Sequence, residues 1–71
     1  MVVLIENNNG HTYQVVKECG NYALIYCEYY DEYIVVYGIE KTLNNKVIWQ
    51  QGRYFSRNKS AAENYFNEIT L

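Results

Sequence analysis

Acidic and phenolic side chains crowd into residues 27–33, which read Cys-Glu-Tyr-Tyr-Asp-Glu-Tyr. Three carboxylates and three phenols make a flat, negatively charged surface that suits an Arg- or Lys-rich partner and imitates the character of nucleic acid. The alternative is a solvated turn whose acids merely protect a sheet end from edge pairing. The residues predicted to bind a protein partner are Glu28, Tyr30, Asp31, Glu32 and Tyr33.

The other candidate reactive side chains lack the partners that catalysis or metal binding needs. His11 is the only histidine and has no suitably placed carboxylate pair, so we interpret it as a solvent-exposed turn residue. Cys19 and Cys27 have no nearby base, and the expected hairpin register places them too far apart for a disulfide, which indicates free structural thiols. The sequence therefore predicts no enzyme, no catalytic residue, no cofactor and no metal.

Basic residues follow the last predicted strand at Arg53, Arg57 and Lys59, near the start of a predicted helix where phosphate can bind. An aromatic sheet with basic edges can also stack single-stranded nucleic acid. The surrounding acids would repel phosphate, and the formal charge of −2 removes the broad basic field that non-specific binding needs. Three solvated cations are the simpler interpretation, and direct nucleic-acid binding stays a minor alternative.

The composition indicates one folded domain. The chain has 71 residues, of which 49% are hydrophobic and 17% aromatic, and it contains no proline. No stretch reaches the roughly 18 apolar residues of a membrane span, and the apolar start lacks the basic region of a signal peptide. We expect a soluble, cytoplasmic protein without a membrane partner.

Turn residues divide the chain into five strands and one helix. Residues 7–10 read Asn-Asn-Asn-Gly, residues 20–21 suit a hairpin turn with glycine first, and residues 44–45 mark another hairpin. Asn58 or Ser60 can cap the helix. The strands are predicted at about 2–6, 12–19, 22–30, 33–41 and 47–55, and the helix at about 59–69.

Consecutive hairpins without a crossover predict an α+β fold: a five-stranded antiparallel β-meander with one C-terminal α-helix packed on one face. A partly closed small barrel is the alternative. With Tyr30 opposite Tyr33, or with a four-residue loop over residues 30–33, side-chain alternation gives the sheet an aliphatic face and a tyrosine face. We expect the apolar stripe of the helix to cover the aliphatic face, which is made by Ile25, Ile34, Val36, Trp49 and Phe55.

The tyrosine face then needs another cover, because soluble monomers rarely expose so large an apolar patch. Sheet curvature, self-association or a foreign partner can each supply it. If Lys41 opposes Lys46, Tyr54 joins this face and Gly38 lies across from Trp49, where the missing side chain makes room for the indole. The possible interface face consists of Tyr22, Tyr26, Tyr37 and Tyr54.

The layout of hairpins, then Val-Ile-Trp-Gln-Gln-Gly-Arg-Tyr-Phe at residues 47–55, then a helix with Ala61-Ala62 and Tyr65-Phe66 resembles small uncharacterised phage and mobile-element proteins of Gram-positive bacteria. That population includes anti-CRISPR and other anti-defence proteins. The resemblance implies a stoichiometric inhibitor that works by occlusion, with the acidic tyrosine hairpin as its contact.

Three functions are therefore expected from the sequence. The first is a non-catalytic protein-binding module that inhibits a nucleic-acid-handling host protein through the hairpin. The second is a structural homodimer that packs through the tyrosine face. The third is a single-stranded nucleic-acid binder.

Overall fold

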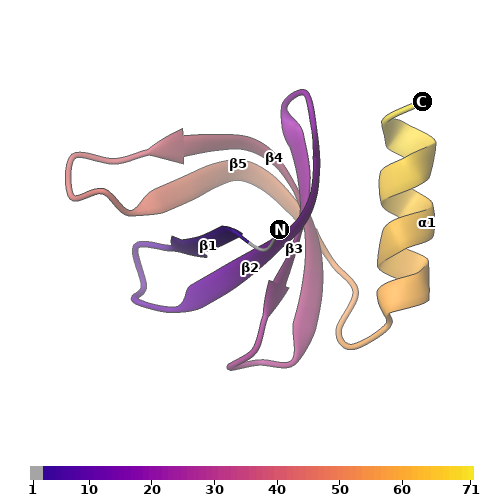
Figure 1. The fold of residues 1–71 in the computed structure, drawn as a ribbon, viewed down its shortest axis with the longest axis horizontal. Coiled ribbons are helices and arrows are strands. Elements are labelled where there is room, and N and C mark those ends of the chain that lie inside the picture. Colours follow the sequence, from indigo (N-terminus) through magenta and orange to yellow (C-terminus); the bar gives the residue numbers. More distant parts are fainter. Residues whose placement is uncertain (1–2) are drawn as a thin grey trace.

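The computed structural model describes residues 3–71 and has an α+β architecture (Figure 1). Five antiparallel strands form one sheet in the order β1-β2-β3-β4-β5, which is the predicted meander. A single helix, α1, follows the strands and packs against one side of the sheet. The bounds are β1 Val3–Glu6, β2 Thr12–Cys19, β3 Tyr22–Cys27, β4 Glu32–Lys41, β5 Val47–Tyr54 and α1 Lys59–Ile69. Residue 2 of the predicted first strand lies outside the described residues.

The β2–β3 hairpin has the predicted turn but a different register further along. Cys19 faces Tyr22 across the turn, and Gly20 has the positive φ of +59° that glycine adopts readily. The register then shifts between Val15 and Lys17, because the intervening residue 16 forms a bulge. Consequently Cys27 pairs with Tyr13, whereas the register that we expect from the Gly20–Asn21 turn without a bulge pairs it with Gln14.

The β3–β4 turn comes earlier than predicted. Its four residues are 28–31, and Tyr33 pairs with Tyr26 rather than Tyr30. The chain turns here because Asp31 adopts a φ of +51° and its N–H donates to the Glu28 carbonyl at 3.3 Å. The register differs from the prediction by four residues. Because four is an even number, every side chain in this hairpin stays on its predicted face.

The β4–β5 register differs from the prediction by one residue. A shift of one residue is enough to move a side chain to the opposite face of the sheet. Lys41 pairs with Val47 instead of residue 46, because Asn45 takes a φ of +61° and the loop closes with the Thr42 N–H on the Lys46 carbonyl at 2.7 Å. Tyr54 therefore pairs with Ile34 and lies on the aliphatic side. Its predicted place on the tyrosine face is wrong.

Room for the indole of Trp49 comes from Gly52 and not from Gly38. A Cβ at Gly52 would lie 3.1 Å from Nε1 of Trp49, whereas Trp49 pairs with Ile39. Gly38 instead has a φ of +71° next to Gln50, where the alternation of β4 breaks. The predicted pairing of a glycine with the tryptophan is thus replaced by a diagonal contact within β5.

The aliphatic face forms an inner core because the sheet curls around it (Figure 1). Tyr13 and Trp49 meet edge-to-face inside the curl, with ring centroids 5.3 Å apart. An isolated parallel bridge between Asn7 and Val47 brings the end of β1 to the start of β5. The arrangement is a partly closed barrel. Its buried residues are Tyr13, Val15, Ala23, Ile25, Cys27, Ile34 and Val36.

The helix covers the tyrosine face, so the predicted packing of α1 on the aliphatic face is wrong. Ala62 and Phe66 of α1 are buried against Leu24 and Val35, which lie on the outer side of β3 and β4. The physical reason is that curling already removes the aliphatic side chains from water, and the convex side is the only broad apolar surface left for the helix. The partly buried residues around this outer core are Tyr22, Tyr33, Phe55, Tyr65 and Ile69.

Local interactions fix both the start of α1 and its position on the sheet. The Asn58 side chain accepts a hydrogen bond from the Ala61 N–H at 3.1 Å, as expected of a helix N-cap. Lys17 of β2 forms an ion pair with Glu63 of α1 at 3.3 Å. No helix in the described part of the chain is long and apolar enough to cross a membrane.

Candidate functional site

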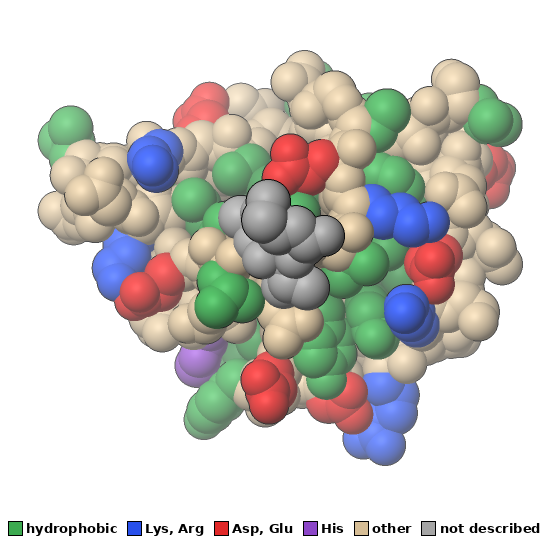
Figure 2. Space-filling model, viewed as in Figure 1, with side chains coloured by type: hydrophobic (Ala, Val, Ile, Leu, Met, Phe, Trp, Pro, Cys, Tyr) green, Lys and Arg blue, Asp and Glu red, His purple; other side chains and the backbone are tan. Residues whose placement is uncertain are grey.

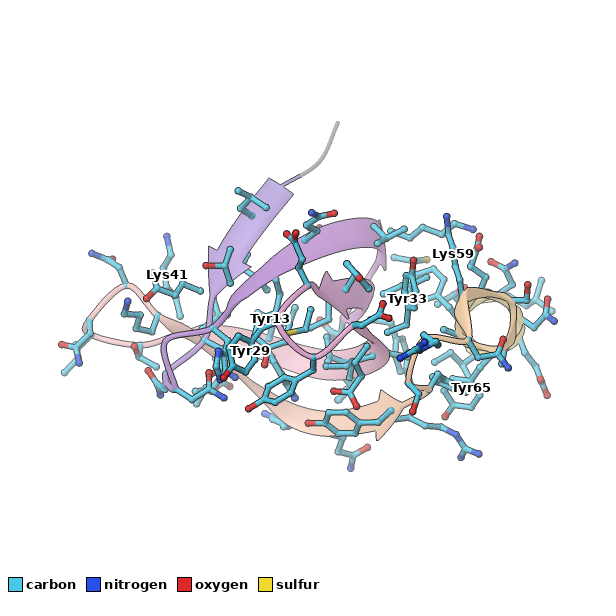
Figure 3. The ribbon with its side chains drawn as sticks, turned by 90° about the horizontal axis from the view of Figure 1, so that it is seen from below. Tyr13, Tyr29, Tyr33, Lys41, Lys59 and Tyr65 are labelled. Atoms are coloured by element: carbon cyan, nitrogen blue, oxygen red, sulfur yellow. The ribbon has the colours of Figure 1, made fainter. Side chains whose placement is uncertain are left out.

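The five residues predicted for partner binding do not form one surface. Glu28 and Tyr30 lie exposed in the β3–β4 turn, and Tyr30 keeps 55% of its surface accessible. Glu32 is half-buried in the first position of β4. Tyr33 packs in the outer core between the sheet and α1 (Figure 3), and its N–H donates to the Ser56 carbonyl. Tyr33 therefore supports the helix and does not belong to the exposed turn.

Asp31 lies in the exposed turn, but its carboxylate contacts two other residues of the same chain. One carboxylate oxygen accepts a hydrogen bond from the Tyr26 hydroxyl at 2.8 Å, and the other lies 3.4 Å from Nε of Arg57. The hydrogen bond to Asp31 is the main cause that raises the pKa of Tyr26 to about 12, because the neutral phenol donates this bond and ionisation would remove it; the charge of Asp31 adds to the effect. The acidic character expected of the turn is reduced by this pairing.

An aromatic cluster lies at the same end of the sheet. Two of its residues, His11 and Tyr29, were not predicted to be contact residues. His11 stacks on Tyr29 with ring centroids 4.4 Å apart, and it meets the edge of Tyr30 at 5.0 Å. The Tyr30 hydroxyl and Nε2 of His11 are 3.1 Å apart, within hydrogen-bond distance. His11 is thus half-buried between two tyrosines, and its interpretation as a solvent-exposed turn residue is wrong.

The asparagine-rich loop between β1 and β2 holds His11 in place. The side chain of Asn7 accepts a hydrogen bond from the Asn9 N–H, and the side chain of Asn9 accepts one from the His11 N–H at 3.1 Å. The Asn7 N–H in turn donates to the His11 carbonyl at 3.0 Å. In a meander, the first and third loops lie at the same end of the sheet, so residues 7–11 and 28–31 were bound to meet. This topological relation was the available signal for the cluster.

The aromatic cluster continues into a shallow hollow on the outer side of β1 and β2. Leu4, Thr12 and Gln14 line it together with His11 and Tyr29. Leu4 keeps 62% and Tyr29 73% of its surface accessible, so both are available to a partner. Figure 2 shows the single histidine, in purple, beside hydrophobic side chains at the lower left of the molecule. We call His11, Glu28, Tyr29 and Tyr30 the hairpin-end cluster.

The four tyrosines of the predicted interface face are separated in the structure. Tyr22 and Tyr37 pack together with ring centroids 4.9 Å apart, and Tyr22 also contacts the outer core under α1. Tyr26 lies against Tyr33, at 4.6 Å. Tyr54 is 57% exposed on the opposite side of the sheet. They do not form a single open face.

The remaining polar side chains can be compared with the pattern of a metal site. Within residues 3–71, no three His, Cys, Asp or Glu side chains come together as a set of metal ligands. The two cysteines are free, as predicted, with Cys19 exposed and Cys27 buried. Acidic and basic side chains are interspersed on the face shown in Figure 2. The described geometry offers aromatic contact surface and hydrogen bonding.

Comparison of the chain with protein-family models, curated proteins and solved structures finds no match.

Proposed function

We propose that this protein is a non-catalytic protein-binding module and that the hairpin-end cluster is its contact surface. The observation that carries the proposal is that an exposed ring is held in a fixed position. Tyr29 is 73% exposed, yet its ring is stacked on His11 with the ring centroids 4.4 Å apart. An aromatic surface that is already held in place loses little conformational freedom on binding, which favours affinity. Tyrosine is also among the side chains that contribute most to protein interfaces.

The side chains around the cluster support one class of partner. Glu28 adds a negative charge beside the rings, and Leu4 adds apolar surface. The matching surface has an apolar or cationic groove that accepts two phenol rings, with a Lys or Arg at its edge. A host protein that handles nucleic acid offers Lys and Arg side chains for such a contact, and the resemblance to phage and mobile-element inhibitors supports that partner class. Inhibition would then follow from occlusion of the surface.

The structure favours this function over the two other expectations. A homodimer through the tyrosine face loses its rationale, because α1 covers Leu24 and Val35 within one chain. A single-strand binder would need cations beside the stacked rings. Of the three basic residues named for that role, Arg53 lines a separate hollow beside α1, Arg57 pairs with Asp31, and Lys59 begins α1.

Affinity capture from a host lysate with matched variants tests the proposal. Y29A/Y30A removes the two exposed rings, while Tyr54→Ala removes an equally exposed ring from the other side of the sheet. We expect the protein captured by the wild type to be lost with Y29A/Y30A and retained with Tyr54→Ala. Retention by the double variant, with folding verified by circular dichroism, would contradict the proposed contact surface.

A further inference from the structure

A second hollow lies between the outer side of β4–β5 and α1, away from the hairpin-end cluster. Its volume is about 240 Å³, and it shares no lining residue with that cluster. Figure 3 shows Tyr65 on the side of α1 that is nearer the end of β5. The side chains that form its walls are Tyr22, Tyr37, Gln51, Arg53, Tyr65 and Ile69.

Among residues 3–71, Arg53 is the only charged residue that lines this hollow. The ion pairs among residues 3–71 join Lys17 to Glu63, Lys46 to Glu6 and Arg57 to Asp31, and none involves Arg53. The guanidinium is therefore a cation without a carboxylate partner in the described structure. Such a group, in a hollow lined by no other charged side chain among the described residues, attracts an anion.

Packing orients the guanidinium. Arg53 faces Val35 in the sheet register, so its side chain leaves the sheet on the helix side. Its Cζ lies 4.9 Å from the centroid of the Tyr65 ring and 5.8 Å from that of Phe55. A guanidinium that lies over aromatic rings uses its flat face for that contact and keeps its N–H donors at the edge, where they match the two oxygens of a carboxylate.

The rest of the hollow suits an apolar ring. Tyr22 and Tyr37 form one wall, with ring planes inclined at 55°, and Val35 and Ile69 add aliphatic surface. The hollow opens to solvent on one side, and its volume exceeds the roughly 150 Å³ in which an enclosed apolar cavity can hold benzene, so the bound ring would stay partly exposed. One aromatic ring with a short acidic arm therefore fits the space.

We propose that this hollow binds an aromatic carboxylate, with the carboxylate on Arg53 and the ring between Tyr65 and the Tyr22–Tyr37 pair. The same chemistry has two sources: a free monocyclic acid, or the C-terminal aromatic residue of a peptide. The proposal does not rest on the function proposed for the hairpin-end cluster, because the two sites use different residues.

Titration of the ¹⁵N-labelled protein, followed by heteronuclear NMR, tests the site. Phenylacetate represents the free acid. A short N-acetylated peptide ending in phenylalanine represents the chain terminus, and its C-terminal amide is the control. We expect shifts at the amides of Gln51, Gly52 and Ile69 with one or both acids, and none with benzylamine or the amidated peptide. Shifts with the peptide alone would assign the ligand to a chain terminus, and shifts with phenylacetate would assign it to a free acid.

Matched arginine variants complete the test. Arg53→Gln should weaken binding by roughly tenfold or more, because it removes a charge-assisted pair of hydrogen bonds. Arg57→Gln removes a cation that instead contacts Asp31, so it should bind as the wild type does. Arg53→Lys keeps the charge without the planar fork and should fall between them. The proposal is overturned if neither acid shifts these amides, if benzylamine shifts them equally, or if Arg53→Gln binds undiminished.

Discussion

Single side chains decide how the exposed β3–β4 turn is held. Asp31 connects the Tyr26 hydroxyl, on the preceding strand, with Arg57, in the segment before α1. It thereby ties the turn to both neighbouring elements while the rings of Tyr29 and Tyr30 stay accessible. The Asp31 carboxylate therefore mainly stabilises the turn. The neighbouring rings of Tyr29 and Tyr30 stay free to contact a partner.

The Tyr26–Asp31 hydrogen bond predicts a specific dependence on pH. It raises the Tyr26 pKa from 10.0 to about 12, so its contribution to stability is fully present below pH 10 and is lost as the pH rises through 12. Asp31→Asn should lower this pKa, because the added negative charge is gone. Absorbance titration of the phenols should show one late-titrating group moving to lower pH. This late-titrating phenol should be absent from the titration of Tyr26→Phe. It should still titrate late in Glu40→Gln, which removes a carboxylate far from Tyr26.

Burial gives one further tyrosine a late titration. Tyr13 is 4% exposed in the inner core, and burial is the main cause that raises its pKa. Its phenol should therefore also titrate late in the wild type and remain late in Asp31→Asn. If Asp31→Asn moved no phenol to lower pH, the bond to Tyr26 would not be the cause of the raised pKa.

Gly52 should be intolerant of a side chain because of the indole beside it. A Cβ there would lie 3.1 Å from Nε1 of Trp49 and 3.5 Å from Cγ2 of Ile34. Gly52→Ala should destabilise the protein by about 1–3 kcal/mol through overpacking, measured by urea unfolding. It should also shift the fluorescence of Trp49, the only tryptophan.

Gly20 provides the control for that substitution. Gly20→Ala meets no atom within 4 Å but must adopt a φ of +59°, so it should lower stability through backbone strain alone. The tryptophan emission should then stay unchanged. Equal emission shifts in both variants would contradict the proposed packing of the indole.

At the scale of elements, the contact between α1 and the sheet depends on small residues. Ala62 has no exposed surface, whereas Ala61 beside it is half-buried. Ala62→Leu should push the helix from Leu24 and Val35 and destabilise the protein by about 1–3 kcal/mol. Ala61→Leu can direct its larger side chain toward solvent and should cost less. Urea unfolding compares the two, and similar losses would contradict the observed helix face.

Sequence patterns predicted the elements well because the turn residues and the two periodicities are local. The order of the strands, the antiparallel sheet and the C-terminal helix are confirmed. Register was harder to predict, because it depends on how many residues a loop absorbs. A shift of four between β3 and β4 preserved every face, while a shift of one between β4 and β5 moved Tyr54 and Arg53 to opposite sides from those expected.

The sheet face that α1 covers could not be read from the pattern. Both faces of β3 are apolar, with Ala23, Leu24 and Ile25 all buried, so alternation alone does not distinguish the inner side from the outer. Which face the helix covers depends on how the whole sheet curls, and this curling is a non-local property. The stacking of His11 on Tyr29 joins two loops 18 positions apart; the meander places both loops at one end of the sheet, but local patterns do not show which side chains meet there.

The whole molecule buries both sides of its sheet without a second chain. The inner side chains are enclosed by the curl, and the Asn7–Val47 bridge and the Lys46–Glu6 ion pair bring the two edge strands together at one end. On the outer side, α1 covers β3 and β4. The remaining exposed aromatic surface is local, at the hairpin-end cluster and at Tyr54.

This closure predicts a monomer in solution, because the broad apolar surface that would drive dimerisation is already buried by α1. Light scattering at micromolar concentration should therefore give the mass of one chain, 8.4 kDa. Removal of residues 58–71 should expose Leu24 and Val35 and cause self-association, which the same measurement detects. The prediction would be contradicted if the full-length chain scattered as a dimer. If a Tyr22→Ser/Tyr37→Ser variant then scattered as a monomer, the dimer interface would lie at the tyrosines beside the helix.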